Sequence, residues 1–337
     1  MSVQYKVLGK PGGDNALMVW VNSGTRIYRL LFDCGEDVLK EIPASDVRSI
    51  DYIFFSHLHL DHAAGLDHFI RRNYDREIKP VYVFGPEDTA SIIQNRLKGY
   101  KWNLVSDIPG EWFVTDIKEN ETITYRFLAR EGFSKKHFVE KKPFKGIVLS
   151  NEHFKVESQL LNHIIPSLAF RISEHSSCNV DKDKLAINNY DPGPWLGEVK
   201  DLSVSPRKSI LIKSRKISLG KLREQLLVKK EGESISYLTD FIYDSASKRK
   251  SIKLIRNCNT VVCESQYLSS DKKLALKNYH LIVAQAAEIA SKGNAGILIL
   301  FHNSDRYNVK EDFPLFLKEA LEIFPNTVFP ENWNIKL

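Results

Sequence analysis

The chain has 337 residues, and 48 Lys and Arg against 42 Asp and Glu give it a net charge of +6. Hydrophobic residues make up 43% and charged residues 27%, with only 17 Gly and 13 Pro. This profile is that of a globular protein and excludes collagen-like, disordered and coiled-coil chains. At ~150 residues per domain the length allows roughly two domains, although α/β folds often form one larger domain.

No segment of the sequence predicts a membrane span or a signal peptide. The longest apolar run near the C-terminus covers 295–301, far short of the ~20 residues that cross a bilayer. The first residues lack the apolar stretch of a signal peptide. Four cysteines without a CxxC pair suit reduced thiols. We therefore expect a cytoplasmic protein with no membrane partner.

Apolar runs rich in β-branched and aromatic residues alternate with helical stretches along the chain. Strands are predicted over 16–22, 27–33, 49–55, 80–84, 154–161, 167–172, 235–239, 259–263, 296–301 and 326–330. Helices are predicted over 86–98, 275–292 and 312–323. The sequence therefore predicts an α/β protein with much antiparallel pairing.

Two regions match a core pattern less well. Residues 100–150 are rich in aromatic residues and lysine but have weak periodicity, and residues 179–233 combine a Pro/Gly-rich turn with basic clusters. We expect an insertion at about 100–150 and an arm at about 179–233, both attached to one core.

The most informative motif is Ser-His-Leu-His-Leu-Asp-His at 56–62, directly after the strand predicted at 49–55. It packs His57, His59, Asp61 and His62 into six positions. Groups crowded this closely repel one another or lose solvation unless something neutralises them, and a pair of divalent ions does so. The alternative is a solvated polar turn that happens to be rich in histidine.

A site with two ions needs more ligands, and three residues offer them. His163, Asp240 and His302 each follow an apolar run of the β type. Loops at strand ends can bring distant ligands to one metal. Each residue alone is more often a hydrogen-bonded turn residue, but together with the motif they form a set.

The motif, followed by a later His, an Asp and a final His, resembles the metallo-β-lactamase-fold hydrolases. Within them, the chain resembles ribonuclease Z, the endonuclease that trims the 3′ ends of precursor tRNA. The resembling segments span nearly the whole chain, at 31–36, 57–66, 163–172, 239–240, 263–264, 279–287 and 300–307.

The resemblance implies an α/β fold, the metallo-β-lactamase αββα sandwich with a projecting arm, as a single domain over 1–337. It also implies two Zn²⁺ per chain, although His and Asp ligands also allow Mn²⁺ or Fe²⁺. One ion would be held by His57, His59 and His163, and the other by Asp61, His62 and His302. Asp240 would bridge the two ions.

Catalytic roles follow from the same resemblance. Asp61 would orient or deprotonate the attacking water. His280, paired with Glu264, would donate a proton to the leaving 3′-oxygen, a role that suits an imidazole. The alternatives are a histidine that caps a helix and a glutamate in a salt bridge.

The resemblance also implies precursor tRNA as partner and a homodimer. Gly193, Pro194 and Lys200 resemble the glycine-proline element of the family's tRNA-gripping arm, whose basic neighbours would contact phosphates. The alternative is a surface hairpin with solvated lysines.

Two rival functions remain open. The first is a metal-dependent phosphodiesterase that acts on a small substrate such as a cyclic nucleotide, for which the arm would have no use. The second is a non-catalytic RNA-binding relative, against which the complete ligand set argues.

Overall fold

The computed structural model describes residues 2–335 and separates into two compact units. The larger unit contains the chain up to Ser173 and from Glu233 onward, and the smaller unit spans Glu174–Gly232. Among the described residues, no helix has the length and apolar character needed to cross a membrane.

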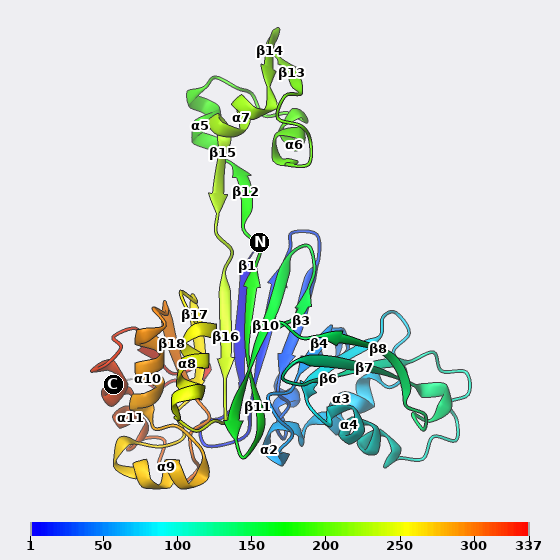
Figure 1. The fold of residues 1–337 in the computed structure, drawn as a ribbon, viewed down its shortest axis with the longest axis vertical. Helices are drawn as coiled ribbons and strands as arrows, with labels where there is room; N and C mark the ends of the chain where they lie inside the picture. Colours follow the sequence, from blue (N-terminus) through cyan, green and yellow to red (C-terminus); the bar gives the residue numbers. More distant parts are fainter. Residues whose placement is uncertain (1, 336–337) are drawn as a thin grey trace. The chain divides into compact units, whose positions relative to one another are not determined.

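The larger unit contains two mixed β-sheets (Figure 1). The first follows chain order with β1 (Ser2–Gly9), β2 (Asn15–Asn22), β3 (Ile27–Phe32), β4 (Tyr52–Phe54), β5 (Val81–Pro86), β6 (Glu111–Ile117), β7 (Glu121–Leu128) and β8 (His137–Pro143). The second has the order β19 (Thr327–Val328), β18 (Ile297–Phe301), β17 (Thr260–Glu264), β16 (Ser234–Leu238), β11 (Ile165–Glu174), β10 (Phe154–His163) and β9 (Ile147–Ser150).

Each of the two sheets contains a set of neighbouring parallel strands besides its antiparallel pairs. Strands β3 to β6 are parallel in the first sheet, and β16 to β19 are parallel in the second. Parallel neighbours end at the same edge of a sheet, so each set lines up several strand ends.

The side chains of β2 point alternately to the two faces of the first sheet and pack into two different hydrophobic clusters. Leu17, Val19 and Val21 belong to the hydrophobic cluster that includes residues of both sheets. Ala16 and Met18, on the opposite face, belong to a second cluster under the helices of the first sheet. Because successive residues of a strand face opposite sides, both faces of the first sheet are buried at β2.

Helices cover the outer face of each sheet and complete the αββα sandwich (Figure 1). Those that follow the strands of the first sheet are α1 (Ala44–Ser49), α2 (Leu60–Ala63), α3 (Leu66–Asn73) and α4 (Thr89–Lys98). Those that follow the strands of the second sheet are α8 (Ser245–Leu254), α9 (Lys272–Asn278), α10 (Val283–Lys292) and α11 (Phe313–Leu321). Short 3₁₀ turns lie at η1 (Val38–Glu41), η2 (Ala129–Glu131), η3 (Ser269–Asp271) and η4 (Glu331–Trp333).

The helix predicted over 275–292 is two helices, α9 and α10. Tyr279 ends α9 in the left-handed conformation, with a φ of 63°, and the His280 N–H donates to the Ala275 carbonyl. Gln285 then caps α10 by accepting from the Ile282 N–H at 3.0 Å. Apolar periodicity continues through the interruption, so pattern alone does not detect it.

Residues 100–150, for which we expected an insertion, form β6 to β9. Three of these strands extend the first sheet and β9 lies at the edge of the second.

The smaller unit has its own core. Strand β12 (Ser177–Val180) pairs with β15 (Leu227–Lys230), and β13 (Ser209–Ile212) forms a hairpin with β14 (Arg215–Ser218). Helices α5 (Lys182–Ile187), α6 (Trp195–Lys200) and α7 (Leu219–Leu226) complete it. Leu185, Val199 and Leu222 are among the residues of its small hydrophobic cluster.

Candidate metal centre

Polar side chains gather where buried strands end in the larger unit. They are Asp33 after β3, His57 after β4, His163 at the end of β10, Asp240 after β16, Glu264 at the end of β17 and His302 after β18. Because β3 and β4 are parallel, as are β16 to β18, each sheet presents its residues at one edge. Asp240 of the second sheet reaches His57 of the first.

The backbone is strained at several of these strand ends. Asp33, Asp240 and His302 have φ values of 57°, 50° and 52°, and Ile164 beside His163 has a φ of 64°. Left-handed conformations are uncommon outside glycine and are most costly for a β-branched residue such as Ile. Strain of this kind concentrates at functional sites, where it aims side chains that a regular strand would not.

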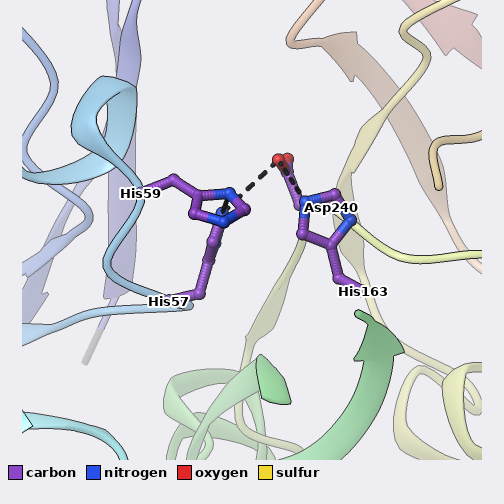
Figure 2. A group of neighbouring side chains, drawn as sticks. All are labelled: His57, His59, His163 and Asp240. Atoms are coloured by element: carbon purple, nitrogen blue, oxygen red, sulfur yellow. Dashed lines mark hydrogen bonds and ion pairs between the residues drawn. The ribbon is translucent and has the colours of Figure 1, made fainter. Parts of the chain in front are cut away.

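The first group of potential ligands is His57, His59, His163 and Asp240 (Figure 2). The Nε2 atoms of His57 and His163 each lie 3.6 Å from Asp240 Oδ2. His59 Nδ1 lies 3.0 Å from His57 Nε2. Four donor atoms from three separate segments therefore converge on one point.

The second group is Asp61, His62, Asp240 and His302. His62 Nε2 lies 3.4 Å from Asp61 Oδ2 and 3.4 Å from Asp240 Oδ2. His302 Nε2 lies 3.0 Å from Asp240 Oδ1. Asp240 is thus common to both groups, with different oxygen atoms toward different histidines.

Each of three histidines is oriented through its Nδ1 atom. His62 Nδ1 lies 2.8 Å from Asp33 Oδ2, His163 Nδ1 lies 3.0 Å from the Tyr279 carbonyl, and His57 Nδ1 lies 3.0 Å from Ser56 Oγ. A partner on one ring nitrogen fixes the ring and leaves the other nitrogen free to bind a metal, the usual arrangement for metal-binding histidines. In all three residues the other nitrogen, Nε2, is the one near Asp240.

Burial and neighbouring charges shift the pKa values of the cluster in opposite directions at different residues. Burial and the neighbouring His62 lower the pKa of His57 to about 2. Burial opposes ionisation of Asp240, but His302 and His62 outweigh it and hold the pKa of that carboxyl well below its usual range. The Nε2 atoms of His62 and His302 are buried and make no hydrogen bond in the described chain. Two buried imidazole nitrogens that make no hydrogen bond and lie beside one carboxylate suit the donor set of a divalent metal.

A third group, Asp240, Glu264 and His280, adjoins the first two. Glu264 is fully buried and accepts from the Phe241 N–H at 2.8 Å and the Leu281 N–H at 3.3 Å. Its Oε2 also lies 3.0 Å from His280 Nδ1. Although burial favours the neutral ring, Glu264 and Asp240 raise the pKa of His280 to about 9.

The structure brings together the predicted ligands and the predicted catalytic residues. Gly193, Pro194 and Lys200, the predicted substrate-binding residues, lie in the smaller unit around α6.

Asp33, for which the sequence predicted no role, is fully buried. Its carboxylate accepts from the Ser56 backbone and hydroxyl, both at 2.7 Å, and from Tyr237 Oη at 2.9 Å, besides holding His62. The sequence does contain a pattern that could have predicted a role for Asp33, because this acidic residue directly follows an apolar strand, as Asp240 does.

Comparisons with known proteins place these features in a family. The ribonuclease Z of Deinococcus radiodurans is 35% identical over 97% of this chain and 97% of its own length. The ribonuclease Z of Prochlorococcus marinus strain AS9601 is 28% identical over 88% of this chain and 86% of its own. A family model described as anti-Pycsar protein Apyc1 matches residues 14–163.

Among solved structures, the metallo-β-lactamase-fold protein YhfI from Bacillus subtilis superposes with a TM-score of 0.56 at 16% identity. The match covers 97% of this chain and 95% of that one. It confirms the predicted fold, and the full-length similarity to a ribonuclease Z at 35% identity identifies the family. The chain belongs to the ribonuclease Z family of metal-dependent hydrolases with the metallo-β-lactamase fold.

Proposed function

We propose that this enzyme is a dinuclear zinc phosphodiesterase that removes the 3′ trailer from precursor tRNA, leaving a 3′-hydroxyl on the tRNA. One observation carries the proposal: two ligand groups, most of whose members are buried, share Asp240, and the His280–Glu264 pair adjoins them. The relatives named ribonuclease Z support the reaction and the substrate class.

The two ligand groups suit a pair of Zn²⁺ ions. His57, His59, His163 and Asp240 would hold one, and Asp61, His62, His302 and Asp240 the other. Sets dominated by imidazole nitrogen with a carboxylate are typical of zinc and also allow Mn²⁺ or Fe²⁺. When bound, two such cations act as Lewis acids that neutralise a phosphodiester and lower the pKa of water.

The side chains around the ligands would divide the proton transfers. Asp61, partly exposed and 3.4 Å from His62, would orient the attacking water and accept its proton. A new bond then forms between the water oxygen and phosphorus as the bond from phosphorus to the 3′-oxygen breaks. Because His280 Nδ1 is held by Glu264, Nε2 is the atom that would donate a proton to the departing 3′-oxygen.

We propose that the smaller unit contacts the tRNA body through Gly193, Pro194 and Lys200. Residues 174–232 carry 12 Lys and Arg against 8 Asp and Glu, a local excess of 12 − 8 = +4 within the overall +6. Cationic side chains bind nucleic acids largely through phosphates.

The test is a cleavage assay with three substrates: a precursor tRNA with a 3′ trailer, bis(p-nitrophenyl) phosphate and a cyclic nucleotide. We expect cleavage of the precursor with a 3′-hydroxyl on the tRNA and a 5′-phosphate on the trailer. His59→Ala should be inactive, whereas His68→Ala, a histidine of α3 outside the ligand groups, should match wild type. Hydrolysis of the small diesters alone would refute tRNA processing, and an active His59→Ala would refute the metal assignment.

A further inference from the structure

We propose that a pocket beside His280 holds the nucleoside that bears the leaving 3′-oxygen, with the ring of Tyr243 as its base-stacking wall. This inference rests on the proposed function. It adds a subsite and a substrate-binding residue that neither the ligand groups nor the family similarity supplies.

The pocket has a volume of about 560 Å³ and lies between the loop after Asp240, helices α9 and α10, and the turn between these helices. Ile242, Leu276 and Ala284 give it apolar walls, and Tyr243 and His280 are part of its lining. Its size is within the ~300–1,000 Å³ of pockets that hold small ligands. A larger cavity of about 1050 Å³, between β1, β18 and α11, includes no residue of the three ligand groups.

The position of His280 indicates which part of the substrate would enter the pocket. His280 Nδ1 lies 4.0 Å from Asp240 Oδ2, and the same residue lines the pocket. In a phosphoryl transfer the attacking and leaving oxygens are roughly in line across phosphorus. If the water attacks from the side of the ligand groups and His280 protonates the leaving oxygen, the nucleoside attached to that oxygen continues past His280 into the pocket.

The chemistry of the walls suits a nucleobase. Tyr243 Oη donates to Glu288 Oε2 at 2.5 Å, and Lys248 Nζ lies 4.8 Å from the centre of its ring. Lys248 also pairs with Glu288 at 2.7 Å, so the ring is held in place before any ligand arrives. Leu276 on α9 lines the pocket and is 63% exposed, so it offers apolar surface that a base would cover.

Stacking also predicts how selective the pocket should be. Every base has a π-face, so an aromatic wall gains affinity from each of them without reading hydrogen-bond patterns. We therefore expect the enzyme to accept any base at the nucleotide before the cut and to lose activity when no base is present there.

The experiment compares a precursor tRNA with one that carries an abasic residue immediately 5′ to the scissile phosphate. Wild type should lose about 10-fold in kcat/KM on the abasic substrate, as expected for one lost base–aromatic stack. Tyr243→Ala should lose about 10-fold on the normal substrate and nothing further on the abasic one. Tyr243→Phe keeps the ring and should stay near wild type on both.

Ala284→Phe provides a second variant, which fills the pocket from α10 without removing a hydrogen bond. It should reproduce the loss on the normal substrate while metal content stays at the wild-type level. Equal cleavage of both substrates by wild type would overturn the inference. So would a further loss when Tyr243→Ala acts on the abasic substrate, because the two changes would then act independently. Failure of wild type to cut any precursor would instead refute the proposed function on which it rests.

Discussion

Asp33 determines how His62 faces the metal centre, although it contributes to neither ligand group. Its buried carboxylate receives hydrogen bonds from Ser56 and Tyr237 as well as contacting His62 Nδ1. Groups that orient a metal ligand tune metal affinity without touching the ion. Asp33 is therefore a positioning residue for the second ligand group.

We predict that Asp33→Asn lowers zinc affinity by ~10–100-fold, the usual effect of removing such a partner. Asn tolerates the left-handed backbone of Asp33, which has a φ of 57°, so the exchange removes the charge and leaves the turn. Competition with a chromophoric chelator measures the affinity. Tyr237→Phe, which deletes one of the bonds to the carboxylate, should have a smaller effect, and equal affinities for Asp33→Asn and wild type would contradict the positioning role.

The sequence identified most of the candidate site because its chemistry is concentrated at strand ends. The motif at 57–62 provides His57, His59, Asp61 and His62 in one segment, and His163, Asp240 and His302 follow apolar runs. What periodicity cannot supply is the pairing between segments, such as the bond from His163 to the Tyr279 carbonyl. Such contacts depend on tertiary structure, because the two residues lie 116 positions apart.

At the scale of elements, strands were easier to predict than the breaks between helices. Strands β2, β3, β10 and β18 follow the predicted ranges closely, because buried β-branched and aromatic runs are distinctive. Strand β1 and the strands β6 to β9 within 100–150 were not predicted. The break that holds His280 was also missed, because it depends on the left-handed conformation of Tyr279.

Arg76 joins two elements of the first sheet. Arg76 is 4% exposed, and its side chain donates to the Ile50 carbonyl before β4 at 2.7 Å and to the Pro80 carbonyl before β5 at 2.5 Å. It also donates to the Lys79 carbonyl at 3.0 Å. We predict that Arg76→Met destabilises the protein by about 3 kcal/mol, because it leaves buried carbonyls unsatisfied.

Urea unfolding followed by circular dichroism measures this loss. Arg71→Met, on the exposed side of α3, removes the same charge without removing buried bonds and should change stability by less than about 0.5 kcal/mol. Similar unfolding midpoints for the two variants would show that Arg76 does not hold these strands together.

At the scale of the whole molecule, the larger unit contains all the ligand groups and the smaller unit has a separate core. The chain enters and leaves the smaller unit at neighbouring positions, because Ser177 pairs with Lys230. A short linker can therefore replace the segment between them.

We predict that replacing residues 178–229 with a short Gly/Ser linker leaves metal content and hydrolysis of bis(p-nitrophenyl) phosphate near wild type. Cleavage of precursor tRNA should fall by on the order of 100-fold, as expected when several phosphate contacts are lost. Kinetics with both substrates, measured at one salt concentration, separate the two effects. Equal losses on both substrates would show that the smaller unit supports the fold and not tRNA binding.

The central proposal is that two metal ions share the Asp240 carboxylate, and a metal titration tests this proposal most directly. Chelator-treated protein is supplied with increasing Zn²⁺, and cleavage of a trailer-bearing precursor tRNA is measured at each step. We predict that activity rises until two equivalents are bound per chain, and that Asp240→Ala loses metal and activity together. Full activity at one equivalent, or at none, would contradict a site built for two ions.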